Sequence, residues 1–280
     1  MATIIGGIAT THVPAIGNAI AKNLQNEPYW KPFFDGFKSA HAWLSVNQPD
    51  VVVVVYNDHG LNFFLDKMPT FAVGAAGEYR HADEGWGLPV SAPFPGDPEF
   101  SWHIIEQLVG NEFDVTSCQE MLVDHAFTLP MALLWPQSPP WPVKTVPVCI
   151  NTVQHPLPSP ARCYKLGQAI ARAVASYPED QKIVILGTGG LSHQLDGTRA
   201  GFINAEFDRY CLRTLVDDPR ALLEYSPEQI IEQAGSQGVE LLNWIAARGT
   251  IPDRVRELQN RYHVPISNTA SAVMLLEQAA

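Results

Sequence analysis

The sequence predicts an α/β fold, in which a central mixed or largely parallel sheet is flanked by helices. Short β-branched runs alternate with segments of helical periodicity, which is the pattern of such folds. Long loops rich in Gly, Pro and acidic residues cover 66–100 and 135–160, and long loops in compact domains often carry function. Because strand signals continue on both sides of these loops, residues 1–280 are expected to form a single domain.

Each predicted element has its own local signal. The strands are expected at Thr3–Ile8, Val51–Tyr56, Val143–Ile150 and Lys182–Leu186. Helical periodicity is found in residues 31–47, 99–110, 159–177 and 204–218. Ser159 followed by Pro160 is typical of a helix start, and Ser226 with Gln229 three residues later indicates a capping box.

Charge and hydropathy exclude several classes of function. The net charge is −11, from 18 basic and 29 acidic residues, and the basic residues are scattered, which disfavours nucleic-acid binding. No apolar run approaches the roughly 18–20 residues that span a bilayer. The amino-terminal segment lacks the basic start of a signal peptide, so a cytoplasmic protein is expected. An anionic substrate would need a local receptor, because the overall field opposes it.

Other motifs narrow the chemistry further. The four cysteines, at positions 118, 149, 163 and 211, form no CxxC pair and are expected to be buried free thiols. The chain contains no G-x-S-x-G motif, which disfavours a serine hydrolase. The run "GTGG" at 187–190 lacks the remainder of a P-loop or dinucleotide fingerprint, and is interpreted as backbone that allows close approach to a site.

Three histidines follow predicted strands by a few residues. His12 comes after "TIIGGIATT", His59 after "VVVVVYND" and His193 after "KIVILGTGGLS". The carboxyl ends of strands face the ligand crevice in open α/β sheets, so the three imidazoles would converge if the strands are parallel neighbours. The alternative for any one of them is a loop histidine with a satisfied hydrogen bond.

An isolated carboxylate could complete such a site. Glu240 lies in the apolar segment "GVELLNWIAARG", for which Ser236 is the expected helix N-cap. A carboxylate in that setting is costly to bury unless it is paired or bound to a metal. Two imidazoles and one carboxylate form the facial triad of non-haem Fe(II) oxygenases. The alternative is a glutamate that merely interacts with a helix N-terminus.

The motifs together resemble the class III extradiol ring-cleavage dioxygenases, especially the catalytic β subunits that cleave protocatechuate. The resemblance covers nearly the whole chain. It rests on "GGIATTHVPAIG", "PDVVVVVYNDH", "ADEGWG", "NEFDVT", "VDHAFTLP", "GTGGLSHQLDGTRAGFINAEFD", "SQGVELLNWIAARG" and "YHVPISNTA". It implies that His12, His59 and Glu240 bind Fe(II), that His193 is the catalytic acid–base, and that His125 is a further catalytic-site histidine that contacts substrate or oxygen.

The resemblance also implies where a substrate carboxylate binds. Ser267 and Asn268, in "ISNTA", match the region that receives it. The following residues, 269–278, are expected to form a helix capped by one of these two residues. Free N–H groups at a helix start could then receive an anion, although the two residues could simply cap the helix.

Two aspartates precede active-site histidines in the sequence. Asp58 comes before His59, and Asp124 comes before His125. A carboxylate–imidazole pair would fix the ring tautomer and raise the basicity of a ligand. Adjacent side chains often point apart, however, so Asp58 could instead close the turn.

The implied reaction is Fe(II)-dependent extradiol cleavage of a carboxylated catechol by O2. Protocatechuate 4,5-cleavage to 4-carboxy-2-hydroxymuconate semialdehyde is the main expectation, and gallate or 3-O-methylgallate cleavage is the alternative within the family. A zinc-dependent hydrolase or a metal-binding protein is the alternative from another class, since the same ligands suit zinc. The resemblance also implies a dimer or an α2β2 assembly, in which a small α subunit could cover the site of a chain that ends at Ala280.

Overall fold

The computed structural model describes residues 1–85, 87–266 and 268–279. The strands are β1 (Thr3–Thr10), β2 (Val51–Tyr56), β3 (Phe71–Gly74), β4 (Glu78–His81), β5 (Phe94–Pro95), β6 (Thr116–Cys118), β7 (Leu122–Val123), β8 (Lys144–Ile150), β9 (Lys182–Thr188), β10 (Val255–Ile266) and β11 (Thr269–Gln278). The α-helices are α1 (Pro14–Ala21), α2 (Lys31–Phe34), α3 (Lys38–Asn47), α4 (Pro98–Gly110), α5 (His125–Leu134), α6 (Pro160–Ser176), α7 (Ala205–Asp217), α8 (Pro227–Ala234) and α9 (Leu241–Gly249). Short 3-10 turns are η1 (Asp35–Phe37), η2 (Gly197–Arg199), η3 (Pro219–Glu224) and η4 (Gly238–Glu240).

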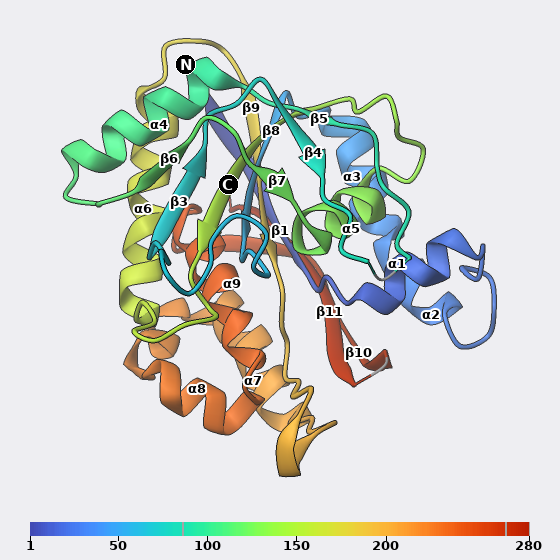
Figure 1. The fold of residues 1–280 in the computed structure, drawn as a ribbon. Coiled ribbons are helices and arrows are strands. Elements are labelled where there is room, and N and C mark those ends of the chain that lie inside the picture. Colours follow the sequence, from blue (N-terminus) through green and yellow to red (C-terminus); the bar gives the residue numbers. More distant parts are fainter. Residues whose placement is uncertain (86, 267, 280) are drawn as a thin grey trace.

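Eight strands form one mixed sheet in the order β10-β11-β1-β9-β2-β8-β3-β6 (Figure 1). The four central strands, β1, β9, β2 and β8, are parallel to one another. Antiparallel pairing joins β11 to β1 and to β10, and joins β3 to β8. A smaller sheet has the order β5-β4-β7. The predicted α/β architecture with a mixed, largely parallel sheet is confirmed.

The five valines of β2 divide the core between the two faces of this sheet. Every residue of Val51–Tyr56 is fully buried. Val51, Val53 and Val55 pack into the apolar cluster that includes residues of α4, α6 and α9, while Val52 and Val54 pack with residues of α1, α3 and α5. Figure 1 shows these two groups of helices on opposite sides of the sheet. Burial on both faces explains why this strand is an unbroken apolar run.

The carboxyl ends of three parallel strands meet at one edge of the sheet. In the β1–β9 pair Thr10 lies opposite Thr188, and in the β2–β9 pair Val55 lies opposite Gly187. His12, His193 and His59 follow these strand ends. The sequence-based condition for their convergence, that the strands be parallel neighbours, is therefore met.

The carboxyl-terminal segment departs from the sequence-based expectation. Residues 269–278, predicted as a helix, form strand β11, which pairs with both β10 and β1. Residues Thr269–Leu276 are all buried. An apolar run covered on both faces shows neither helical nor strand periodicity, and only pairing with a strand from the opposite end of the chain decides its conformation. Ser267 lies outside the described residues.

The start of α9 also differs from the prediction. Ser236 is not an N-cap: its hydroxyl donates to Oε1 of Gln237. The chain instead makes the 3-10 turn η4, and Glu240 itself occupies the cap position of α9. The glutamate therefore lies at the junction of a turn and a helix, which points its side chain toward the strand ends rather than along the helix.

Several local expectations are confirmed. Ser159 accepts a hydrogen bond from the backbone N–H of Arg162, and Ser226 with Gln229 forms a complete capping box. All four cysteines are free and buried. Among the described residues, no helix combines the length and the apolar character needed to cross a bilayer.

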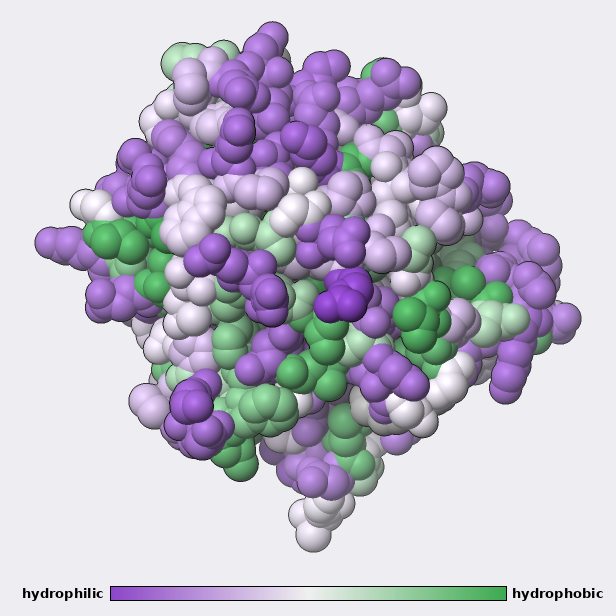
Figure 2. Space-filling view, turned by 45° about the horizontal axis from the view of Figure 1, so that its top comes forward, coloured by the Kyte–Doolittle hydropathy of each residue, from purple (hydrophilic) through white to green (hydrophobic). Residues whose placement is uncertain are grey.

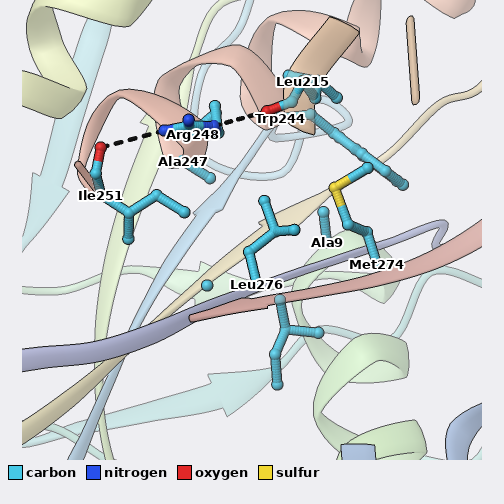
Figure 3. Close-up of a pocket in the computed structure, with 10 residues that line it drawn as sticks. Ala9, Leu215, Trp244, Ala247, Arg248, Ile251, Met274 and Leu276 are labelled. Carbon is cyan, nitrogen blue, oxygen red and sulfur yellow. Dashed lines mark hydrogen bonds between the residues drawn. The ribbon is translucent and has the colours of Figure 1, made fainter. Parts of the chain in front are cut away.

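Helix α9 is anchored at its far end by a buried arginine (Figure 3). The guanidinium of Arg248 donates to the carbonyl of Leu215 at 2.6 Å and to that of Ile251 at 3.1 Å. Two further carbonyls, from the next two residues of the chain, complete its partners. Beside it, Trp244 and Met274 line a small apolar cavity of about 20 Å³ between α9 and the sheet. These bonds satisfy the buried charge and tie the end of α9 to α7 and to the loop that leads into β10.

Hydrophobic side chains are dispersed on the face of the molecule in Figure 2. This view shows hydrophilic residues over much of the surface, with hydrophobic ones scattered between them. Exposed apolar residues such as Val46, Val90 and Val109 come from separate elements of the chain. Single exposed apolar residues of this kind are ordinary for a folded protein.

The contact between α6 and α9 depends on glycine. A Cβ at Gly167 would lie 2.0 Å from the carbonyl oxygen of Ala246, whereas a Cβ at Gly110 of α4 would meet nothing within 4 Å. We expect Gly167→Ala to lower the free energy of unfolding by about 1–3 kcal/mol through overpacking. The matched Gly110→Ala should be neutral or slightly stabilising, because both glycines are helical. Urea denaturation measures both, and equal midpoints would contradict this account of the contact.

Candidate active site

A cavity of about 520 Å³ lies at the carboxyl edge of the central strands. Five of the residues singled out in the sequence line it: His12, His59, His125, His193 and Glu240. They come from five separate parts of the chain. A volume of this size lies within the range of about 300–1,000 Å³ that is usual for small-molecule sites.

Two imidazoles and one carboxylate converge inside this cavity. Nε2 of His12 lies 3.4 Å from Oε1 of Glu240, and Nε2 of His59 lies 3.5 Å from the same oxygen. The two rings are perpendicular, with centroids 5.3 Å apart. Donor atoms bound about 2.1 Å from one ion lie roughly 3.0–3.5 Å apart, so these three groups fit a single divalent metal ion.

Glu240 is a buried anion, since only 5% of the residue is exposed. Its Oε2 accepts from the backbone N–H of Gly190 at 2.9 Å, and its Oε1 accepts from Nδ2 of Asn57 at 3.3 Å. Burial acts to raise the pKa of this carboxyl, but the imidazoles of His12 and His59 outweigh it and hold the pKa well below its usual range. A carboxylate kept ionised in this way suits a bound cation.

The glycine run after β9 makes room for Glu240. Gly189 has φ +106°, a conformation that favours glycine, and a Cβ there would lie 2.8 Å from Cβ of Glu240. The indole of Trp244 also donates to the carbonyl of Gly189 at 2.8 Å. This close approach supports the interpretation of "GTGG" as backbone shaped by the site.

Asp124 orients His59, although its sequence neighbour is His125. Oδ2 of Asp124 lies 3.0 Å from Nδ1 of His59 and also accepts the backbone N–H of His59 at 2.8 Å. Burial acts to lower the pKa of His59, and Asp124 raises it well above the ordinary value. The imidazole thus presents Nε2 to the cavity. Asp124 also caps α5 through the N–H of Ala126.

Asp58 closes the turn after β2 rather than orienting an imidazole. Its carboxylate accepts backbone N–H groups from four residues, Gly60, Leu61, Asn62 and Phe63. It also accepts the side-chain amide of Asn62 at 2.7 Å. The question that the sequence left open about Asp58 is therefore answered in favour of the turn.

His125 has an acidic partner that sequence reasoning missed. Its Nδ1 lies 2.6 Å from Oε1 of Glu84, and its backbone N–H donates to Oε2 of the same residue at 2.8 Å. Burial lowers the pKa of His125 even so. Its ring stacks on that of His59, with centroids 4.2 Å apart, and could supply a further metal-binding nitrogen beside His12 and His59. The only signal for Glu84 was its place in the motif "ADEGWG".

His193 approaches Oε2 of Glu240, whereas His12 and His59 approach Oε1. Its Nδ1 is 2.9 Å from the carbonyl oxygen of Leu191, which can only accept, so the neutral ring carries its proton on Nδ1. Nε2 then has a free lone pair and lies 3.8 Å from Oε2 of Glu240. A basic nitrogen at this position is suited to proton transfer next to the three converging ligands.

Comparison with known families agrees with this arrangement. The profile of the family described as the catalytic LigB subunit of aromatic ring-opening dioxygenase matches residues 6–274. The chain belongs to the LigB family. This match covers both ends of the sheet and all five histidine and glutamate positions of the cavity. The resemblance noted in the sequence motifs is therefore confirmed.

Individual relatives differ in how much of this LigB-family chain they share. A gallate dioxygenase of Pseudomonas putida is 41% identical over 196 residues, covering 70% of this chain and 57% of the relative. The chain thus spans less than two thirds of that relative's length. A 2,3-dihydroxyphenylpropionate/2,3-dihydroxicinnamic acid 1,2-dioxygenase of Rhodococcus jostii is 28% identical over 255 residues, covering 75% of this chain and 79% of the relative.

A solved structure shares the fold. The crystal structure of an uncharacterized protein from Escherichia coli K12 matches with a TM-score of 0.58 at 13% identity. The match covers 97% of this LigB-family chain and 99% of the other chain. At this identity the likeness is evidence for the architecture of the sheet and its helices.

Asn268, one of the two residues expected to bind a substrate carboxylate, is not among the described residues that line the cavity. Asn268 is exposed in the turn between β10 and β11, and Ser267 lies outside the described residues. The next residue, Thr269, does line the cavity and forms an isolated bridge with His193. The helix start that was expected to receive an anion is absent here, because this segment is a strand. A role for Asn268 remains a prediction.

The contact between Asp124 and His59 generates a test of metal binding. We expect Asp124→Asn to weaken the binding of Fe(II) or Co(II) by about 10- to 100-fold, because the imidazole loses the partner that orients it and raises its basicity. Asp66→Asn is the matched control, since that exposed carboxylate pairs only with Lys67 among the interactions seen for it. Equilibrium dialysis gives both dissociation constants. Unchanged affinity in Asp124→Asn would contradict the role of Asp124 in orienting His59 for metal binding.

Proposed function

We propose that this chain catalyses extradiol cleavage of a carboxylated catechol by O2, with gallate as the preferred substrate. The observation that carries the proposal is the convergence of His12, His59 and Glu240 on one point of an open cavity, with His193 beside it, in a member of the LigB family. The fold by itself would not support a reaction, because one architecture hosts many activities.

The donor set is suited to iron. His12, His59 and Glu240 would hold one Fe(II) on one face, which is the arrangement of non-haem iron oxygenases. Bound there, the metal would supply the Lewis-acid and redox chemistry that brings a catechol and O2 together. The surrounding protein keeps these ligands ready: Thr188 lies 3.2 Å from Nδ1 of His12, and Asp124 holds His59.

The imidazoles beyond the ligand set would manage protons and orientation. Nε2 of His193 would accept the proton of a catechol hydroxyl, because Nδ1 is already committed to a carbonyl. The same nitrogen would return the proton as the ring opens, a double task that suits the pKa range of histidine. His125, held by Glu84, would contact a hydroxyl or oxygen from the other side of the cavity.

The substrate proposal rests on relatives. Gallate is placed before protocatechuate because a relative named for gallate, from Pseudomonas putida, shares 41% identity with this chain over 70% of its length. The sequence motifs alone had pointed first to protocatechuate. The two acids differ by one ring hydroxyl, so a polar group near the third hydroxyl would decide between them. Ser236, Gln237 and Thr152 supply polar side chains to the cavity lining.

A substrate panel tests the reaction and its specificity. With anaerobically reconstituted Fe(II), we expect kcat/KM for gallate to exceed that for protocatechuate and for 3-O-methylgallate. Oxygen electrode traces should show one O2 consumed for each ring opened. No oxygen uptake with any carboxylated catechol would exclude the proposal and leave zinc-dependent hydrolysis or metal binding as the function.

The panel also addresses the assembly. The sequence resemblance implied a dimer or an α2β2 complex with a small α subunit, and this remains a prediction. Measuring kcat/KM for each substrate with and without a candidate small subunit separates the possibilities. A self-sufficient homo-oligomer would show the same values in both conditions.

Two substitutions separate the assigned roles. His59→Ala should lose bound iron and turnover together, because His59 is assigned as a ligand. His193→Ala should retain iron and lose turnover by about 10²- to 10⁴-fold, because it removes only proton transfer. Iron content by colorimetric assay and turnover by oxygen uptake are measured on the same samples. Release of iron from His193→Ala would contradict this division of roles.

A further inference from the structure

A buried carboxylate outside the cavity grips the residue before His193. Asp208 of α7 is only 1% exposed. Its Oδ1 accepts the backbone N–H of Ser192 at 2.9 Å, and its Oδ2 accepts the hydroxyl of Ser192 at 2.6 Å. Oδ2 also accepts the phenol hydroxyl of Tyr262, from β10, at 2.7 Å. One side chain therefore holds both the main chain and the side chain of Ser192.

The direction of these bonds is fixed by their surroundings. Ser192 is fully buried, and its Oγ accepts the backbone N–H of Asn204 at 2.9 Å. The hydroxyl proton is therefore left to donate to Asp208. Burial raises the pKa of Asp208, and the hydrogen bonds from Ser192 and Tyr262 act against that rise. As the acceptor of all three bonds Asp208 acts as a carboxylate, and charge-assisted bonds of this kind are shorter and stronger than neutral ones.

The backbone held by Asp208 sets the position of the His193 ring. Nδ1 of His193 bonds to the carbonyl of Leu191, so the imidazole is tied to the main chain on the other side of Ser192. The N–H of His193 donates to the carbonyl of Ala234 at 2.8 Å. A Cβ at Gly235 would lie 2.3 Å from the carbonyl oxygen of His193, so this segment has little room to shift.

We propose that Asp208 is a positioning residue for the reaction, which holds the Leu191–His193 segment so that Nε2 of His193 faces the substrate. This inference rests on the proposed function, since it concerns how the assigned acid–base is placed. Asp208 makes no contact with the cavity ligands among the interactions described. Its carboxylate acts through Ser192, and a small misplacement of a catalytic group can cost about 10²-fold in rate.

A purely stabilising role is the competing explanation. Burying a carboxylate costs free energy, whereas burying well-packed apolar residues does not. A buried carboxylate by itself is therefore weak evidence for a stabilising role. Tyr262 offers the means to separate the two roles, because its hydroxyl bonds the same carboxylate but does not touch Ser192. Tyr262→Phe removes one bond from Asp208 and leaves both bonds from Ser192 intact.

The experiment compares Asp208→Asn with Tyr262→Phe in the Fe(II)-loaded enzyme. For Asp208→Asn we expect kcat to fall about 10- to 100-fold while KM and iron content stay within about twofold of wild type. For Tyr262→Phe we expect kcat to stay within about twofold of wild type, even if its melting temperature falls as much as that of Asp208→Asn. Unchanged kcat in Asp208→Asn overturns the proposal. A loss of iron or a parallel change in KM also overturns it, because the residue would then support the whole site.

A second variant and a structural measurement keep the test decisive. If Asp208→Asn does not fold, Ser192→Ala is measured instead: it keeps the backbone bond to Asp208, and a smaller loss of kcat with KM unchanged is expected. Wild-type kcat in Ser192→Ala overturns the proposal.

If the wild-type protein cleaves no catechol, the proposed function fails. The crystal structure of the Asp208→Asn or Ser192→Ala variant then decides the positioning role. A displaced His193 imidazole supports it, and an unmoved one overturns it.

Discussion

The ionised carboxylate of Glu240, buried beside imidazoles, is the constraint on which the site depends. A buried anion must be compensated, and neither lysine nor arginine is among its described partners. Compensation comes from His12 and His59, which follow the parallel strands β1 and β2 on either side of β9, and from the N–H of Gly190. Helix α9 begins beside the strand ends, and its later turns are held by the close glycine contacts with α6 and by the carbonyl bonds of Arg248.

Each imidazole of the cavity has its Nδ1 committed to a fixed partner. The pairs are His12 with Thr188, His59 with Asp124, His125 with Glu84 and His193 with Leu191. In two of these rings, His12 and His59, Nε2 points toward Glu240 and lies within 3.5 Å of its Oε1. Partners of this kind set tautomer and orientation, so metal affinity and proton transfer depend on residues that never touch a substrate. Asp208 extends the same principle one residue further, through Ser192.

Local patterns predicted the elements whose environment is simple. The valines of β2 and the capping box at Ser226 lie where the sequence placed them, because burial and helix capping are encoded within a few residues. The strand at residues 269–278 was mistaken for a helix, because its partners β1 and β10 decide its conformation. The start of α9 was misplaced for a similar reason: Glu240 takes its position from the strand ends, not from a cap at Ser236.

The sequence by itself determined the alternating strands and helices, the histidines that trail three of those strands, and the unusual carboxylate at Glu240. Tertiary structure alone decided which acid serves which imidazole. Asp124 adjoins His125 in the chain but orients His59, and His125 takes Glu84 from a loop some forty residues earlier. Adjacent residues at a strand or helix end point in different directions, so sequence neighbours seldom pair. The pairing depends on where the sheet edge brings distant loops together.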